Sequence, residues 1–245
     1  MSTSNNQDIV PDLIAHAKSI GLTTLWASQE LPVRPPMLPN YGAVKTWNFD
    51  RATLESIRPA IPYLPGSTEF TADLAELQRI NESQTREQAA IANYWADGPG
   101  SYTPPGLWHR YACQAGVDAK YSEVRMARML AYVGTALMDA GVACWETKYF
   151  YYSPRPQQFD LKTSVGLPNF PSYTSGHSTF SFAASTVLAS FFPEKSNAFN
   201  SYAQQASDSR VYGLIHFRVD CTMGGKHGKA IGTYAVQKAN ADGAQ

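Results

Sequence analysis

The chain has 245 residues, of which 44% are hydrophobic, 12% aromatic and 16% charged. This composition is typical of a folded globular protein and excludes a charge-rich disordered chain. Lys plus Arg number 20 and Asp plus Glu number 20, so the formal net charge is zero, and we expect neither a nucleic-acid partner nor an anionic lipid surface. An anionic ligand would therefore have to be held by a local cluster of positive side chains.

The cysteines and the apolar stretches exclude further classes of protein, namely disulfide-rich, zinc-binding and membrane-spanning proteins. Cys113, Cys144 and Cys221 are few and widely spaced, which fits neither a disulfide framework nor a zinc site. Residues 1–7 lack the basic start and apolar run of a secretory signal, so no signal peptide is expected in the sequence as given. The apolar stretch at residues 180–192 is too short for a membrane span. We expect a soluble protein without a transmembrane helix.

The first part of the chain is predicted to be one short helix followed by a long extended segment. Apolar residues at helical spacing predict a helix over residues 11–20, with Pro11 at its start. Seven prolines between residues 31 and 65 exclude long helices there and favour an ordered, wrapping segment. We divide the chain into an N-terminal helix and extended segment, residues 1–37, and a helical domain, residues 38–245.

Helical periodicity continues through most of the helical domain. Residues 68–96 carry apolar side chains every three or four positions, which predicts one broken helix or two consecutive helices. Glycine and proline at residues 98–100 end this pattern, and Pro104-Pro105-Gly106 is expected to prolong the break.

Further helices are predicted after this break. The longest should span residues 118–148, and the others should lie at residues 177–192, 196–207 and around 231–236. Strand-like alternation is scarce and no repeat or linker divides the chain. We therefore predict an all-α fold, a single-domain helical bundle with a long Pro-rich N-terminal wrapping segment.

Two positive side chains stand close together near the end of the predicted central helix. Lys148 ends that helix, and Arg155 follows seven residues later in a turn stiffened by Pro154 and Pro156. The two cations would converge there. A lysine at a helix C-terminus also stabilises the helix dipole, and an arginine beside a proline is common on surfaces, so the motif alone favours this ordinary role.

A second motif leads directly into the predicted helix at residues 177–192. Ser175 is well suited to cap that helix, with Gly176 and His177 after it. A helix start presents free backbone N–H groups at the positive end of the helix dipole, which suits a tetrahedral anion. The alternative is a simple capping turn with an exposed histidine, and taken alone this motif favours it.

The third motif is a histidine four residues before an aspartate. His216 and Asp220 would share one helical face, where the carboxylate accepts a proton from one ring nitrogen and fixes the tautomer. The other nitrogen is then free to act as a nucleophile or a ligand. Arg210, nearly two turns earlier, adds a third cation. An exposed helix pair is the alternative interpretation.

Taken in order, the three motifs resemble the signature of a known superfamily. Its pattern is K-x6-R-P, then P-S-G-H, then S-R-x5-H-x3-D, and it joins type 2 phosphatidic acid phosphatases, bacterial class A acid phosphatases and vanadium-dependent haloperoxidases. Residues 86–112, which include Trp95 and Trp108, and residues 38–42 are similar to the soluble haloperoxidase-like branch. The resemblance covers the chain from about Leu38 to its end.

The resemblance implies which residues would bind the anion. The non-axial oxygens of vanadate or phosphate would be bound by Lys148, Arg155 and Arg210, and Ser175 and the Gly176 N–H would add hydrogen bonds. One position departs from the pattern, because Thr174 stands where the family usually has proline. Every group that must contact the anion is nevertheless present.

The resemblance also implies the roles of the remaining site residues. His216 would be the axial group, binding the vanadium of vanadate or attacking phosphorus. His177 would act as the acid/base, and Asp220 would hold His216 in its reactive tautomer. The physical requirements agree with this reading, since a tetrahedral oxyanion that becomes five-coordinate needs positive donors around its equatorial oxygens and an in-line nucleophile.

These residues do not decide between three functions. The favoured one is a haloperoxidase-like enzyme that oxidises halide with hydrogen peroxide at a vanadate cofactor. The second is a metal-independent acid phosphatase that cleaves a phosphate ester through a phosphohistidine, and the third is a non-catalytic, anion-binding helical scaffold. The resemblance suggests a periplasmic or secreted location and leaves homo-oligomer formation open. Relatives often have a longer N-terminus.

Other motifs give weaker signals. The run Gly224-Gly225-Lys226-His227-Gly228-Lys229 fails the Walker spacing and is predicted to be a helical stretch packed closely on a neighbour. No zincin, paired C-x-x-C or EF-hand sequence is present, so no divalent metal is expected. His16 and His109 are isolated and are expected to be structural or exposed.

Overall fold

The computed structural model describes residues 9–244, and in that range the protein is built from helices and contains no strand. No helix among these residues is both long enough and apolar enough to cross a bilayer. The expectation about a signal peptide concerns residues 1–7, which lie outside the described residues. The helices are α1 Val10–Ser19, η1 Tyr41–Ala43, α2 Arg51–Ser56, α3 Thr68–Ser83, α4 Arg86–Tyr94, α5 Thr103–Asp118, α6 Glu123–Tyr151, η2 Pro156–Phe159, α7 Gly176–Phe191, η3 Pro193–Lys195, α8 Ser196–Tyr212 and α9 Arg218–Asn240.

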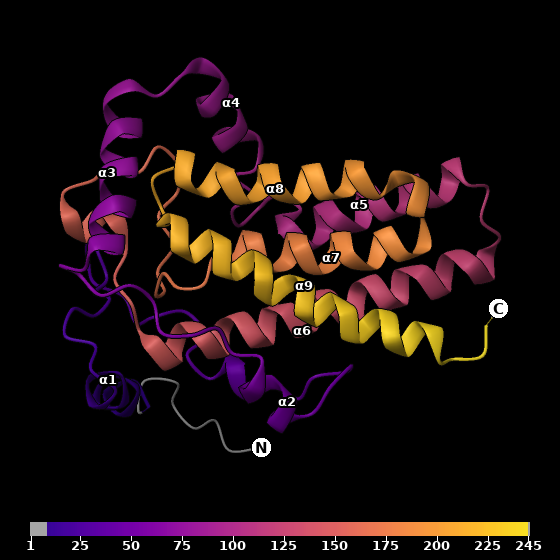
Figure 1. The fold of residues 1–245 in the computed structure, drawn as a ribbon, viewed down its shortest axis with the longest axis horizontal. Helices are drawn as coiled ribbons and strands as arrows, with labels where there is room; N and C mark the ends of the chain where they lie inside the picture. The colour runs from indigo at the N-terminus through magenta and orange to yellow at the C-terminus, as the bar shows by residue number, and fades with distance from the viewer. Residues whose placement is uncertain (1–8, 245) are drawn as a thin grey trace.

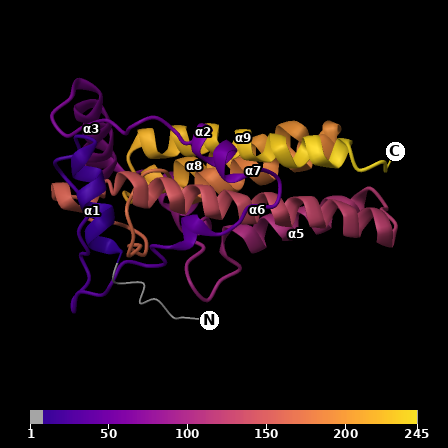
Figure 2. The same ribbon diagram turned by 90° about the horizontal axis from the view of Figure 1, so that it is seen from below.

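An elongated bundle of α5 to α9 forms the body of the molecule, with α1, α3 and α4 at one end and α2 along one side (Figures 1 and 2). Helix α7 lies at its centre and packs against α5, α6, α8 and α9. Its buried aliphatic and aromatic side chains join one continuous core with those of its neighbours. The predicted all-α bundle is confirmed.

The helix boundaries differ most clearly from the sequence-based prediction at the start of α5. We expected Pro104-Pro105-Gly106 to prolong a break, but α5 begins at Thr103 and these residues form its first turn. Proline is favoured at the start of a helix because the first N–H groups have no intrahelical partner to lose. The predicted helix at residues 118–148 is correspondingly displaced, since α5 ends at Asp118 and α6 runs from Glu123 to Tyr151.

The proline-rich N-terminal part wraps the bundle as an ordered segment. The backbone N–H of Trp26 donates to the carbonyl of Tyr152 (2.8 Å), and that of Met37 donates to the carbonyl of Asn169 (2.9 Å). The segment also contains the short helix α2, whose N-cap Asp50 accepts a hydrogen bond from the Thr53 N–H. These contacts attach it to the end of α6 and to the loop before α7.

Helices α7 and α9 approach each other closely along a row of glycines on α9. A Cβ atom at Gly224 would lie 2.9 Å from the carbonyl oxygen of Ser175, and one at Gly232 would lie 2.7 Å from that of Ala183. Gly228, between them, faces the carbonyl of Thr179 equally tightly. The sequence-based interpretation of residues 224–229 as a helical stretch packed on a neighbour is therefore confirmed.

Candidate anion-binding site

Four helix ends meet at the end of the bundle next to α3 (Figure 1). Helix α6 ends there, α7 begins there, and the loop at residues 213–217 joins the end of α8 to the start of α9. The loop before α7 is attached to this junction by backbone contacts: the Ser175 N–H donates to the carbonyl of Asp220 (3.0 Å), and the Ser172 N–H donates to that of Ser153 (3.1 Å). All three sequence motifs therefore reach one place.

Lys148 reaches this junction from the last turn of α6 and is fully buried. Its ammonium nitrogen donates to the carbonyl oxygens of Pro171, Ser172 and Thr174, at 3.1, 2.6 and 2.5 Å. The lysine thus ties the loop before α7 to α6. Thr174, the departure from the family pattern, takes part through its backbone carbonyl, so the missing proline does not remove this contact.

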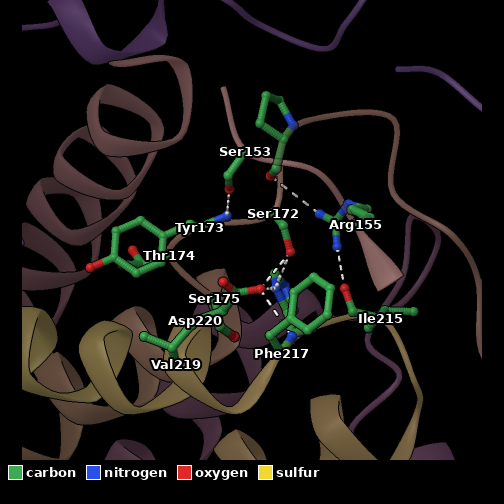
Figure 3. Close-up of polar contacts among 12 residues, drawn as sticks. Ser153, Arg155, Ser172, Tyr173, Thr174, Ser175, Ile215, Phe217, Val219 and Asp220 are labelled. Atoms are coloured by element: carbon green, nitrogen blue, oxygen red, sulfur yellow. Dashed lines mark hydrogen bonds and ion pairs between the residues drawn. The ribbon is translucent and has the colours of Figure 1, made fainter. Parts of the chain in front are cut away.

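Arg155 lies beside Lys148, with its side chain 1% exposed. Its Nε donates to the carbonyl of Phe170 (2.8 Å) and one terminal nitrogen donates to the carbonyl of Ile215 (2.7 Å), as Figure 3 shows for Ile215. A guanidinium group has five N–H donors. Arg155 therefore bridges two loops and still has N–H groups for a ligand.

Arg210 and His177 both bind to the C-terminal end of α4. Arg210, in the last turns of α8, donates to the carbonyl of Ala92 (3.0 Å) and to the hydroxyl of Ser209 (2.8 Å). His177 Nε2 lies 2.8 Å from the carbonyl oxygen of Trp95. Because a carbonyl only accepts, Nε2 carries the proton, and the lone pair of the neutral ring is at Nδ1.

None of the three cations pairs with a carboxylate of the described residues, whereas Arg58 pairs with Glu146. Burial lowers the pKa of Lys148 to about 8 and the pKa values of Arg155 and Arg210 to about 10. The charge of Asp220 acts on Lys148 and Arg155 and offsets part of this effect. A buried charge without a counter-ion is costly, so this part of the molecule favours a bound anion.

His216 and Asp220 interact closely in the core of the site. His216 Nδ1 lies 3.0 Å from Asp220 Oδ2, and the hydroxyl of Ser172 donates to the same oxygen (2.5 Å; Figure 3). Both side chains are buried, and His216 Nε2 makes no hydrogen bond with any described residue. With the proton held at Nδ1 by Asp220, the lone pair at Nε2 is available to a ligand.

The helical context of this pair differs from the prediction. We expected His216 and Asp220 on one helical face, but His216 lies in the loop and α9 begins only at Arg218. Asp220 sits in the first turn of α9, where its Oδ2 also accepts from the Phe217 N–H (3.1 Å). The contact arises because Asp220 caps the helix and the chain folds back at that cap, rather than from helical spacing. The alternative of an exposed pair is excluded by the burial.

The start of α7 supplies backbone donors. Ser175 is the N-cap, as expected, and its hydroxyl oxygen accepts a hydrogen bond from the Ser178 N–H (3.4 Å). The N–H groups of Gly176 and His177 have no partner among the described residues, as the first turn of a helix leaves them. They point out of the positive end of the helix dipole.

Burial and nearby positive charge also affect the two histidines. Desolvation, and then the positive charges of Arg155 and Lys148, hold the pKa of His216 well below its usual value. Desolvation, and then Arg210, do the same for His177. Both imidazoles are therefore neutral near neutral pH, one with its lone pair at Nε2 and the other with its lone pair at Nδ1.

The chemistry of this donor set fits a small oxyanion such as vanadate or phosphate. Three buried cations, two unpaired N–H groups and one imidazole lone pair contribute to one junction. Among the described residues, no group of three or more His, Cys, Asp or Glu side chains could hold a bare metal ion. The site suits a ligand that brings its own oxygen atoms, because such a ligand accepts from N–H donors.

Comparison of the sequence with protein families gives a match over the same region. The model of the PAP2 superfamily matches residues 127–242, which contain all three motifs. This part of the chain is therefore similar to the PAP2 superfamily. No curated protein sequence gives a significant match.

Several solved structures share the fold of this chain. A bacterial vanadium-dependent iodoperoxidase is similar with a TM-score of 0.78 and 24% sequence identity, over 91% of this chain and 64% of that chain. The apo form of a bacterial vanadium-dependent chloroperoxidase gives 0.72 and 13%, over 90% and 63%. The holo form of such an enzyme gives 0.69 and 12%, over 91% and 63%. The chain spans less than two thirds of the length of these proteins.

Two site features were missed by the sequence analysis. Ser172, three residues before Ser175, was given no role, yet its hydroxyl contacts both His216 Nδ1 (3.1 Å) and Asp220. The backbone carbonyls of Ala92 and Trp95 orient Arg210 and His177. Every residue has a backbone carbonyl, so the residue types at these positions do not reveal this role. A proline-serine pair ahead of the Ser-Gly-His motif is the only signal that pointed to Ser172.

Proposed function

We propose that this protein is a vanadate-dependent, haloperoxidase-like enzyme that uses hydrogen peroxide to oxidise a halide. The observation that carries the proposal is the cluster of Lys148, Arg155 and Arg210, which are buried without carboxylate partners beside the free Nε2 of His216. Similarity of fold to iodo- and chloroperoxidases supports this reaction over others of the superfamily.

In this proposal each residue has a defined task. Arg155 and Arg210 would donate their unused N–H groups to oxygens of vanadate, together with the N–H of Gly176. Lys148 would add positive charge and could exchange one of its three carbonyl partners for an oxygen of the anion. His216 Nε2 would bind the vanadium. When bound, vanadate supplies an electrophilic centre that activates peroxide toward halide.

His177 is suited to accept a proton. Its Nε2 is committed to the carbonyl of Trp95, its ring is neutral, and its Nδ1 lone pair is free to take a proton from incoming hydrogen peroxide. Protonating the leaving oxygen of a phosphate ester would instead require an imidazolium beside Arg210. This arrangement favours peroxide activation over ester hydrolysis.

The second candidate is a metal-independent acid phosphatase, which the PAP2 match itself favours. There His216 Nε2 would attack phosphorus to give a phosphohistidine, and the same cations would bind the phosphoryl oxygens. The substrates in either case are small molecules. The third candidate is a scaffold that binds an anion without reaction. It would use the three cations, and the two histidines would have no chemical role.

Parallel assays separate these functions. The purified protein is tested for peroxide-dependent oxidation of iodide and bromide, and for hydrolysis of p-nitrophenyl phosphate, each with and without vanadate. We expect halide oxidation only after addition of vanadate and its loss in His216→Ala, with His16→Ala as a matched control on α1. Ester hydrolysis that vanadate inhibits would establish the phosphatase instead, and anion binding without either activity would leave the scaffold.

A further inference from the structure

A cavity lies between α5, α6 and α7, and none of the proposed anion-binding residues lines it. Its volume is about 410 Å³, which is within the range of small-molecule sites. The walls are apolar and aromatic, and no Asp, Glu, Lys or Arg contributes to them. They are formed by Leu38, Tyr41, Pro105, His109, Gly134, Leu137, Met138, Gly141, Trp145 and Phe180.

His109 supplies a defined polar group in this wall. Its Nδ1 lies 2.9 Å from the carbonyl oxygen of Pro105, one turn earlier on α5. Since a carbonyl only accepts, Nδ1 carries the proton of the neutral ring and Nε2 is an acceptor. No described residue donates to Nε2, and a Cβ atom at Gly134 would lie 3.4 Å from it. The cavity therefore combines apolar walls with one unpaired acceptor.

Glycines on α6 let neighbouring rings pack closely against the helix backbone at the cavity wall. Gly134 and Gly141 are two turns apart on the same helix, and both line the cavity. A Cβ atom at Gly141 would already lie 3.3 Å from the ring of Phe180 and 3.5 Å from that of Tyr41. The rings of Phe180 and Tyr41 therefore pack on the backbone at Gly141, and this aromatic wall favours an aromatic guest.

The cavity and the anion site share a wall. Phe180 and Trp145 line the cavity, and a Cβ atom at Gly176 would lie 3.9 and 4.0 Å from those same two rings. Trp145 also stands one turn before Lys148 on α6. A molecule in the cavity is therefore separated from the Gly176 N–H by the thickness of one aromatic side chain.

We propose that this cavity binds a small, neutral, electron-rich aromatic molecule with a single N–H or O–H donor, such as an indole or a phenol, whose donor bonds to His109 Nε2. The absence of charged side chains from the cavity wall selects a neutral guest, and the unpaired acceptor selects one with a donor. The site is defined by its geometry; its part in catalysis rests on the proposed function.

If the proposed function holds, the bound ring is the organic acceptor of the reaction. Peroxide oxidises halide to hypohalous acid, in which the halide has lost two electrons and the peroxide has gained them. The ring then attacks the halogen: a carbon–halogen bond forms, a carbon–hydrogen bond breaks, and the released proton combines with the hydroxide of the hypohalous acid to give water.

Binding is tested with indole and 1-methylindole, which differ by the N–H donor. Isothermal titration of the full chain, without peroxide, halide or vanadate, should show indole binding about five- to tenfold more tightly than 1-methylindole, as one hydrogen bond to an imidazole predicts. In His109→Phe, which keeps a ring of similar size, this preference should vanish. Equal binding of the two indoles by the unmodified protein would overturn the proposal.

A second variant fills the cavity without harming the fold. Gly134→Ala places a methyl group next to His109 Nε2 and replaces glycine inside a helix, which favours folding. We expect a melting temperature at or above that of the parent protein and at least a tenfold loss of indole affinity. Val124→Ala, at an exposed position of the same helix, is the control and should change neither indole affinity nor preference.

The two proposals fail in different ways. Formation of triiodide from iodide needs no organic acceptor and reports on the anion site alone. Triiodide formation together with indole affinity that is unchanged in Gly134→Ala would contradict the cavity proposal and leave the haloperoxidase standing. Indole binding that is lost in Gly134→Ala, in a protein that oxidises no halide, would support the cavity and contradict the haloperoxidase.

Discussion

Two kinds of buried or half-buried cation occur in this protein, and they differ in whether a carboxylate pairs with them. Arg218 at the start of α9 is held between Glu76 (2.6 Å) and Asp208 (2.5 Å), and Arg58 is paired with Glu146. Lys148, Arg155 and Arg210 are buried more deeply and have backbone carbonyls and hydroxyls instead of carboxylate partners.

The pKa values follow this difference in opposite directions. Hydrogen bonds to Glu76 and Asp208 outweigh the desolvation of Arg218 and raise its pKa, whereas burial lowers the pKa of Arg155 and of Arg210 to about 10. Carbonyl dipoles solvate a cation but carry no net charge. The charge of each paired arginine is already balanced by a carboxylate. The charges of the unpaired cations are not balanced, so a bound anion would stabilise them further.

The largest expected effect comes from removing an unpaired cation. Arg210→Gln should weaken binding of inorganic phosphate about a hundredfold, because a charge-assisted hydrogen bond to a buried oxyanion is lost. Titration calorimetry measures the affinity. Arg218→Gln, on the paired cation, is the matched control and should bind phosphate as tightly as the parent protein. Equal losses in the two variants would show that the distinction between the two kinds of cation is unimportant for the anion.

A smaller effect is expected where a side chain acts through its neighbour. Asp220→Asn keeps the shape and the acceptor for the Phe217 N–H but removes the charge that fixes the tautomer of His216. Halide oxidation should fall about tenfold to a hundredfold, while phosphate affinity changes much less. Steady-state kinetics at saturating vanadate measure the first and calorimetry the second. A parallel loss of both would indicate a collapsed site.

The charge of Lys148 makes anion affinity dependent on pH. Burial lowers its pKa to about 8, so the free protein loses this charge as the pH rises past that value. A bound anion favours the protonated form, and phosphate affinity should therefore decrease above about pH 8, by up to tenfold per pH unit. Lys148→Gln should bind phosphate weakly at all pH values without this decline. A decline of the same slope in Lys148→Gln would assign it to another group.

The smallest effect is expected on the paired side of the comparison. Arg218→Gln leaves two carboxylates without their cation, but these side chains are partly exposed and water replaces much of the interaction. The free energy of unfolding should fall by about 1 kcal/mol, or about 2–4 °C in melting temperature. Thermal denaturation followed by circular dichroism measures it. Added phosphate should still raise the melting temperature of this variant as it does that of the parent.

The sequence predicted the helical bundle because the relevant signals are local. The spacing of apolar residues predicted the helices α1, α3, α4, α7 and α9. The N-cap residue Ser175 predicted where α7 begins. The start of α5 was missed because Pro104 and Pro105 act as breakers inside a helix and as initiators at its first turn, and composition alone does not distinguish the two positions.

The sequence predicted which residues meet at the candidate site better than it predicted how they are arranged. The motifs named every cation and histidine that the structure brings to the junction, but helical spacing was the wrong reason for the contact between His216 and Asp220. The cavity beside His109 was beyond sequence reasoning. It depends on missing side chains at Gly134, which lies near His109, and at Gly141, which lies near Tyr41 and Phe180, and these neighbours meet only in the folded chain.

The glycine row between α7 and α9 couples the packing of the bundle interior to the candidate anion-binding site. Helix α7 begins at Gly176, and α9 carries Asp220 in its first turn. The spacing between these helices therefore sets the distance between the backbone N–H donors at the start of α7 and the Asp220 carboxylate that orients His216. A methyl group at Gly224 or Gly232 would push the two helices apart. A change of packing in the middle of the bundle would therefore also change the geometry of the candidate site.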